Sequence, residues 1–143
     1  MKHSSIKPAD SRILTMNGGS SSIKFAVFES ADPLRRVLEG AIDLLGLPDA
    51  ALRVTGANRA DHISRPVSAM DQGAAAAALV AWIEERVRRE RLVAIGHRVV
   101  HGGPKYFKPE RITPEVIVEL RRMSPLDPEH MPEEILLAET LQR

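Results

Sequence analysis

Residues 13–24 read ILTMNGGSSSIK, and this run contains two apolar segments joined by turn-forming residues. The first segment ends at Asn17 and two glycines, where glycine adopts backbone angles that other residues avoid. From Ser22 onward, apolar side chains take alternate positions, which is the period of a half-buried strand. These apolar residues are Ile23, Phe25 and Val27. We therefore expect two strands that form a hairpin around residues 18–21.

Further extended segments are expected along the chain. Residues 37–44 and 52–55 are two of them, and a loop or ragged strand is expected around Ile63 and Val67. Residues 92–100 are strongly apolar and β-branched and end at two glycines, which predicts a largely buried strand.

Three helices are expected. After Asp71, an alanine run leads into Leu79, Ile83 and Val87, which are spaced four apart and share one helical face. Thr113 followed by proline is typical of a helix start, with the threonine as N-cap. The last helix is expected over residues 133–142.

Length and composition limit the possible functions. With 143 residues, 43% of them hydrophobic and 27% charged, the chain can form one core, or part of a larger domain. A net charge of +1 provides no broad field for nucleic acid or an anionic membrane, and neither is an expected partner. The absence of cysteine excludes disulfides and thiol nucleophiles and is compatible with a cytoplasmic protein.

The first residues and the lengths of the apolar runs give two further expectations. Residues 1–12 are polar and lack the apolar core of a secretory signal, so we expect a disordered leader before a domain over residues 13–143. There is no run of about 18 apolar residues, which is the length that a membrane-spanning helix needs.

The hairpin turn offers many hydrogen-bond donors to an anion. Its glycines let the backbone approach closely, while the amide, the hydroxyls and the lysine surround the turn. The candidate phosphate-binding residues are Asn17, Gly19, Ser20, Ser21, Ser22 and Lys24. An ordinary hairpin turn explains the same residues about equally well. The spacing of a P-loop is absent.

A second motif, GHRVVHGG, occupies residues 96–103. In a strand, Arg98 points to the face opposite His97 and His101. A buried arginine needs an anionic partner, and the residues alone favour an ion pair with one of the chain's own carboxylates over a bound ligand. The two histidines lack the helical zinc-protease pattern, so we expect satisfied structural histidines.

The loop before the last helix contains His130 among prolines and acidic residues. A loop histidine is usually inert, but one beside a phosphate site can donate a hydrogen bond to a transferring group. The neighbouring acidic residues are interpreted mainly as favourable charges at a helix start. These residues are Asp127, Glu129, Glu133 and Glu134.

Together, the two motifs resemble the acetate kinase family. Residues 13–24 are similar to the amino-terminal motif of that family, in which a strand leads to Asn, any residue, Gly and a serine run. Residues 95–103 are similar to its second motif, about eighty residues later. The resemblance covers residues 13–143.

The resemblance implies an α/β fold of the ribonuclease H-like and actin-like ATPase class, shared by acetate and sugar kinases, actin and Hsp70. In this class, two related domains built on mixed sheets with flanking helices hold a nucleotide between them. This chain resembles part of the first domain, an incomplete fold. The implied reaction is reversible phosphoryl transfer from ATP to acetate or another short-chain carboxylate, giving acetyl phosphate and ADP with Mg²⁺.

The resemblance also implies roles for individual residues. Asn17 matches an asparagine near the transferring phosphoryl group and the metal, and Ser20 and Ser22 match flanking hydroxyls. Arg98 matches the arginine that binds the carboxylate of the acyl substrate, which reverses the preference for an ion pair. His130, followed by Met131 and Pro132, is similar to the family's His-Asn-Pro loop and is a candidate transition-state donor.

The family's catalytic aspartate, second substrate arginine, adenosine-binding loops and metal-binding glutamate have no match within residues 1–143. We therefore expect this chain to be the amino-terminal part of a longer kinase, inactive alone, whose complete form is a homodimer. Propionate kinase of the same family is an alternative, and a non-catalytic binding or interaction module is another.

Overall fold

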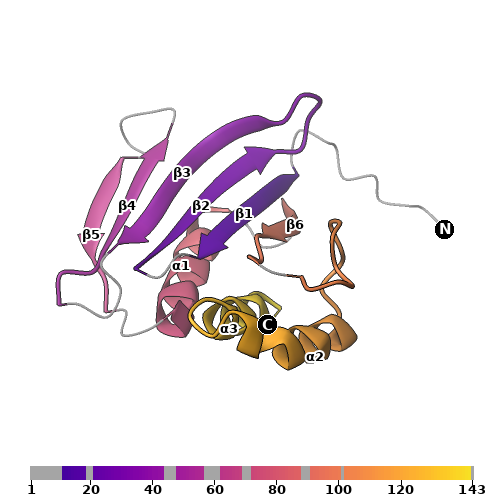
Figure 1. The fold of residues 1–143 in the computed structure, drawn as a ribbon. Helices are drawn as coiled ribbons and strands as arrows, with labels where there is room; N and C mark the ends of the chain where they lie inside the picture. The colour runs from indigo at the N-terminus through magenta and orange to yellow at the C-terminus, as the bar shows by residue number, and fades with distance from the viewer. Residues whose placement is uncertain are drawn as a thin grey trace.

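A computed structural model of the chain describes residues 11–18, 21–43, 48–56, 62–68, 72–87, 91–100 and 102–142. Its strands form one sheet in the order β5-β4-β3-β2-β1-β6 (Figure 1). The strand bounds are β1 Arg12–Gly18, β2 Ser22–Glu29, β3 Arg35–Asp43, β4 Ala51–Gly56, β5 Ile63–Pro66 and β6 Leu92–His97. The helix bounds are α1 Gln72–Arg86, α2 Pro114–Met123, the short 3-10 helix η4 Ser124–Leu126, and α3 Met131–Leu141.

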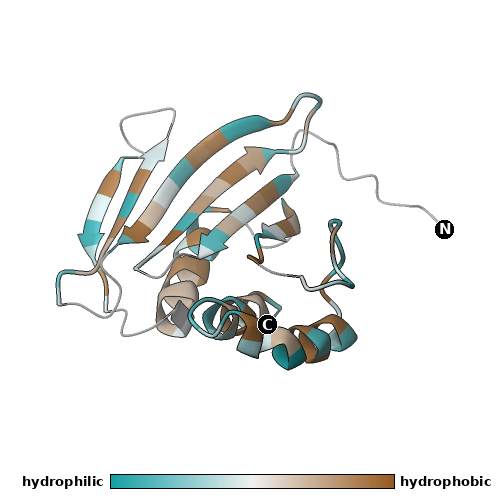
Figure 2. Ribbon diagram, viewed as in Figure 1, coloured by the Kyte–Doolittle hydropathy of each residue, from teal (hydrophilic) through white to brown (hydrophobic). Residues whose placement is uncertain are grey.

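The expected hairpin is confirmed by β1 and β2, which pair antiparallel with Asn17 opposite Lys24. Alternate side chains of both strands are buried, and Figure 2 shows the matching alternation of hydrophobic and hydrophilic residues along the sheet. The buried ones are Leu14, Met16, Ile23, Phe25 and Val27. Because the side-chain period of a strand is two, their neighbours must lie on the other face.

The sheet is mixed, as expected for the fold class. Strands β1 to β5 pair antiparallel in succession, whereas β6 returns parallel to β1 after α1. All three long helices lie on one side of the sheet (Figure 1). We call the side away from them the open face.

The buried apolar side chains form two clusters, one between the sheet and the helices and one between helices. In α1, Leu79 and Ile83 are buried against the sheet, as the four-residue spacing predicted, and Trp82 is buried beside them. Val87, the third residue of the predicted face, follows the last residue of α1 and packs half-buried against the same cluster. Burial of each such side chain stabilises the fold by about 1.5–3 kcal/mol. The second cluster joins α2 and α3. The predicted cap is confirmed, because the Thr113 hydroxyl accepts a hydrogen bond from the Val116 N–H at 3.3 Å.

The prediction that residues 92–100 form a largely buried strand is wrong. Strand β6 ends at His97, and Val93 and Ile95 are 49% and 38% exposed. The reason is position, because β6 is the last strand of the sheet and, among the described strands, pairs with β1 alone. A cleft of about 630 Å³ also separates its helix-facing side from α2 and α3.

The last two residues of the expected leader, residues 11 and 12, belong to the ordered structure. Strand β1 begins at Arg12, and Ser11 before it is buried and accepts a hydrogen bond from the Ser30 N–H through its carbonyl oxygen. Residues 1–10 of the expected leader lie outside the described residues.

Candidate functional site

A cleft of about 510 Å³ on the open face brings three predicted site residues together. These are Asn17, Lys24 and Arg98, from the end of β1, the start of β2 and the residue after β6. The remaining lining residues are Thr15, Met16, Phe25, Ala26, Gly96 and His97. Asn17 and Arg98 are 81 positions apart in the sequence. They are neighbours in the structure because β2, β1 and β6 are adjacent strands of the sheet.

Strand geometry explains this convergence. Asn17 and Lys24 are direct cross-strand partners, and both are exposed. The neighbouring side chains of Met16, Ile23 and Phe25 pack inward. Arg98 follows His97, the residue that pairs with Met16, and its N–H donates to the Met16 carbonyl oxygen at 3.1 Å. This bond continues the parallel ladder by one residue and keeps Arg98 beside the end of β1.

The electrostatics of the cleft favour an anion. Two cationic side chains and one amide meet there, and no Asp or Glu is among the lining residues that the structure describes. An exposed ammonium and a guanidinium next to each other repel, so a bound carboxylate or phosphate stabilises the pair. The guanidinium also matches a carboxylate or phosphate in bidentate fashion.

The expectation from the residues alone that Arg98 forms a structural ion pair is wrong. The side chain is exposed, and within the described part of the chain it forms no ion pair. Its premise was burial in an apolar strand, but β6 ends one residue earlier at the edge of the sheet. Arg98 is therefore available to a ligand.

The serine run is only partly visible. Gly19 and Ser20 lie outside the described residues. Ser21 is exposed and Ser22 begins β2, and neither lines the cleft with Arg98.

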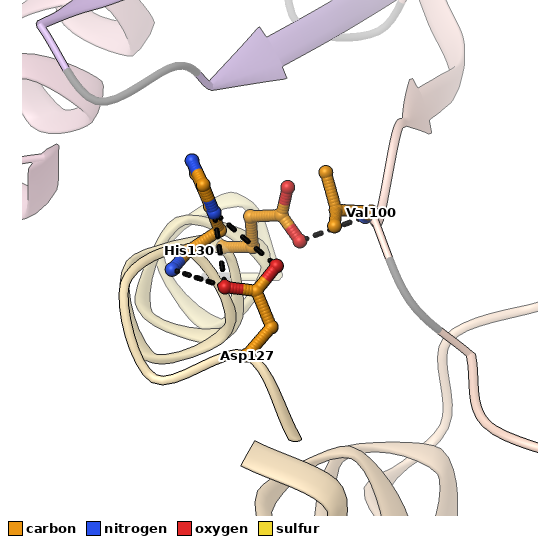
Figure 3. Close-up of polar contacts among 4 residues, drawn as sticks. Val100, Asp127 and His130 are labelled. Atoms are coloured by element: carbon orange, nitrogen blue, oxygen red, sulfur yellow. Dashed lines mark hydrogen bonds and ion pairs between the residues drawn. The ribbon is translucent and has the colours of Figure 1, made fainter. Parts of the chain in front are cut away.

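His130 lies at the start of α3 and does not line this cleft. Its Nδ1 lies 3.0 Å from Asp127 Oδ1, and its backbone N–H donates to the same oxygen at 3.2 Å (Figure 3). The hydrogen bond with Asp127 raises the pKa of His130 and lowers the pKa of the Asp127 carboxyl. Because an ionised carboxylate only accepts, Nδ1 carries a proton here.

Glu134 is a residue whose role sequence reasoning missed. It is only 3% exposed, and its Oε2 accepts a hydrogen bond from the Val100 N–H at 2.9 Å (Figure 3). Burial raises the pKa of this carboxyl, while the Val100 hydrogen bond and the nearby charges of His130 and Arg98 oppose the rise. The bond connects the segment that carries Arg98 to α3, the helix that His130 precedes. From the sequence, Glu134 indicated only a favourable charge at the start of a helix. Its hydrogen-bond partner, the Val100 N–H, lies 34 residues away and left no local signal.

His97 contradicts the expectation of satisfied histidines. Both ring nitrogens are buried, and neither has a hydrogen-bond partner among the described residues. Burial lowers the pKa of His97 to about 4. His101, its expected companion, lies outside the described residues.

No three His, Asp or Glu side chains among the described residues gather closely enough to hold a metal ion. None of the helices that the structure describes has the length and apolarity to cross a membrane.

Sequence comparison identifies one family along almost the whole chain. The model of the acetokinase family matches residues 12–143. The chain is 39% identical over 138 residues to an acetate kinase of Rhodopseudomonas palustris, covering 92% of this chain and 34% of that protein. An acetate kinase of Deinococcus radiodurans is 36% identical over 130 residues, with 91% and 32% covered.

Solved structures agree with the observed fold. The crystal structure of Porphyromonas gingivalis acetate kinase matches with a TM-score of 0.79 and 28% identity, covering 92% of this chain and 34% of that one. A propionate kinase of Francisella tularensis matches with a TM-score of 0.80 and 26% identity, covering 92% and 33%. The chain thus spans about a third of the length of the relatives that it matches.

Proposed function

The chain belongs to the acetokinase family, and from this premise we propose that it supplies one wall of the site for reversible phosphoryl transfer from ATP to acetate. The products are acetyl phosphate and ADP. The observation that carries the proposal is the convergence of Asn17, Lys24 and Arg98 at one cleft whose described lining contains no carboxylate. We also propose that residues 13–143 form the amino-terminal part of a longer, cytoplasmic protein that assembles as a homodimer.

Each residue has a role that its chemistry supports. Arg98 binds the carboxylate of acetate through its planar guanidinium. Asn17 donates its amide N–H to the transferring phosphoryl group, and the hydroxyls of Ser20 and Ser22 flank it. The Lys24 ammonium adds positive charge on the strand opposite Asn17. His130 donates a hydrogen bond to the group in transfer. Such transfer depends on positioning and on neutralising negative charge, which these donors provide.

The magnesium ion of the proposed reaction finds few ligands in this chain. Mg²⁺ prefers carboxylate, phosphate and water oxygens in octahedral geometry, and the cleft contains cations instead. Among the cleft residues, the Asn17 amide oxygen and the Thr15 hydroxyl are the neutral side-chain oxygens. The described residues therefore do not fit a protein-built magnesium site, and no step is assigned to the ion here.

The single wall limits what this chain does alone. Kinase sites exclude water by closing two lobes around the substrates, and one lobe has no opposing surface. We expect no appreciable acetyl phosphate formation from acetate and ATP by residues 1–143. Formation of acetyl phosphate from acetate and ATP by the isolated chain would contradict this.

Propionate is a second candidate substrate, because a solved relative with a TM-score of 0.80 is a propionate kinase. Steady-state assays of the longer protein with acetate and with propionate distinguish the two by their kcat/KM ratio. If neither acid is phosphorylated, the non-catalytic binding module replaces both proposals.

The proposal is tested by Arg98→Ala and Arg98→Lys in the longer protein. Charged hydrogen bonds contribute about 1.5–3 kcal/mol, so we expect R98A to lower kcat/KM for the carboxylate by about 10- to 100-fold. R98K restores charge but not the bidentate geometry, so its activity falls between those of R98A and the wild type. The matched control is Arg53→Ala, an exposed arginine of β4 that lies outside the cleft. Equal activity of R98A and R53A would refute the role of Arg98.

A further inference from the structure

The contact between Asp127 and His130 leads beyond the family resemblance. The carboxylate of Asp127 receives both the ring Nδ1–H and the backbone N–H of His130. Two hydrogen bonds from one residue to one carboxylate fix the ring and the backbone together. Figure 3 shows the other ring nitrogen pointing away from Asp127. In this view it points to the side on which β1 ends, and α3 contacts β1.

We propose that Asp127 is a positioning residue for the phosphoryl transfer, holding His130 so that Nε2 is directed away from α3 as a hydrogen-bond donor. The inference rests on the proposed function for its catalytic consequence. Asp127 itself touches no reacting group and acts only through the imidazole. The proposed action transfers no proton, because Asp127 accepts a hydrogen bond from Nδ1–H and the imidazolium form of His130 donates one through Nε2–H.

The tautomer explains why the carboxylate matters. With Nδ1–H bonded to Asp127, neutral His130 has a bare Nε2, which accepts but does not donate. Only the imidazolium presents an Nε2–H to a phosphoryl oxygen. A carboxylate at 3.0 Å favours that cation, so the same contact that orients the ring also keeps it a donor.

The surrounding charges act in the same direction with smaller effect. Glu129 in the preceding loop and Glu134 in α3 both raise the pKa of His130, whereas desolvation lowers it. Arg98 is the cation of the neighbouring segment, and its charge acts on Glu134. Asp127 is the largest contributor and the only one of these carboxylates with a hydrogen bond to the ring.

The first test is an NMR titration of the His130 ring in the 143-residue chain, which needs no substrate. We expect the midpoint of wild-type His130 to lie above 6.5 and the Nδ1 to be protonated at every pH. Asp127→Asn keeps an acceptor for Nδ1 but loses the charge, so the midpoint moves to lower pH while the ring tautomer is retained. Asp127→Ala loses both. Glu133→Gln, an exposed charge of the same first turn, is the control and leaves the midpoint unchanged.

The second test is the pH profile of the longer protein. As the pH rises, kcat falls when His130 loses its proton, and we expect this fall to occur at a lower pH in D127N than in the wild type. The KM for the carboxylate should be unchanged, and the pH profile of E133Q should match that of the wild type. A wild-type His130 midpoint that D127N leaves in place would overturn the inference, even if the kinase is active. Absence of kinase activity from all forms would instead refute the proposed function. A shifted midpoint with an unchanged kcat profile would show that Asp127 does not serve the transfer.

Discussion

His97 predicts a measurable loss of stability in mild acid. Its ring nitrogens are buried without partners, and burial lowers its pKa from 6.5 to about 4. The folded state therefore binds the proton more weakly than the unfolded state, so stability is complete above pH 6.5 and declines as the pH falls toward 4. One pKa unit corresponds to about 1.4 kcal/mol, which sets the total loss at about 3 kcal/mol and the loss at pH 5 at about 2 kcal/mol.

The perturbation that isolates this effect is His97→Leu, which removes the titrating group and keeps an apolar side chain. At pH 7 we expect the variant to be as stable as the wild type or more stable, because unpartnered ring nitrogens contribute no hydrogen bond to lose. At pH 5 the variant should exceed the wild type by about 2 kcal/mol. Taking the difference between the two proteins cancels the opposite pH dependence of other groups, such as Glu134.

Urea unfolding followed by tryptophan fluorescence measures this difference. Trp82 is the only tryptophan, is 3% exposed and packs edge-on against Phe25 at 6.1 Å, so it reports on the main core. His62→Gln, at an exposed position before β5, provides a control for loss of a histidine elsewhere. If the wild type and H97L lose equal stability between pH 7 and pH 5, the ring is hydrated or bonded in solution, and the reasoning is refuted.

Four further substitutions, two at Glu134 and one each at Gly40 and Gly96, test the packing. Glu134→Gln keeps an acceptor for the Val100 N–H. Because burial raises the pKa of the Glu134 carboxyl, the wild type loses stability as the pH rises above 4.5, and this variant does not. Glu134→Ala leaves the Val100 N–H unpaired and should lower the free energy of unfolding by about 1–3 kcal/mol at pH 7. Equal unfolding free energies of the two variants would contradict this. Gly40→Ala places a Cβ against a backbone carbonyl of β4 and 2.7 Å from the Phe25 ring, so urea unfolding should show a loss of stability of about 1–3 kcal/mol. Gly96→Ala, whose Cβ has its nearest neighbour at 3.8 Å, should lose less stability. A reversed order would refute the packing argument.

Local patterns predicted the elements that depend on nearby residues. The β1–β2 hairpin follows from alternation of apolar residues around an Asn-Gly-Gly turn, and both the turn and the register are local. The start of α2 follows from Thr113 and the proline after it, because a cap is satisfied within three residues. In both cases the partners of each interaction are close in sequence.

Burial and pairing between distant segments were harder to predict. The composition of residues 92–100 indicated a buried strand, but burial depends on which elements lie beside it, and β6 is at the edge. The same error produced the expectation, from the residues alone, of a structural ion pair at Arg98, which is exposed and follows the end of the strand. For Glu134, the sequence contained no signal of the Val100 N–H.

The candidate site shows why the family resemblance was more informative than the residue types. An exposed lysine, an asparagine in a turn and an arginine after a strand each have an ordinary explanation. Their significance comes from the parallel return of β6 to β1, which puts Arg98 beside the end of the strand that carries Asn17. Glu134 then connects that same segment to the helix of His130 through one buried hydrogen bond. Loss of this bond should therefore displace the carboxylate-binding arginine and the phosphoryl donor relative to each other, even though Glu134 lies outside the cleft.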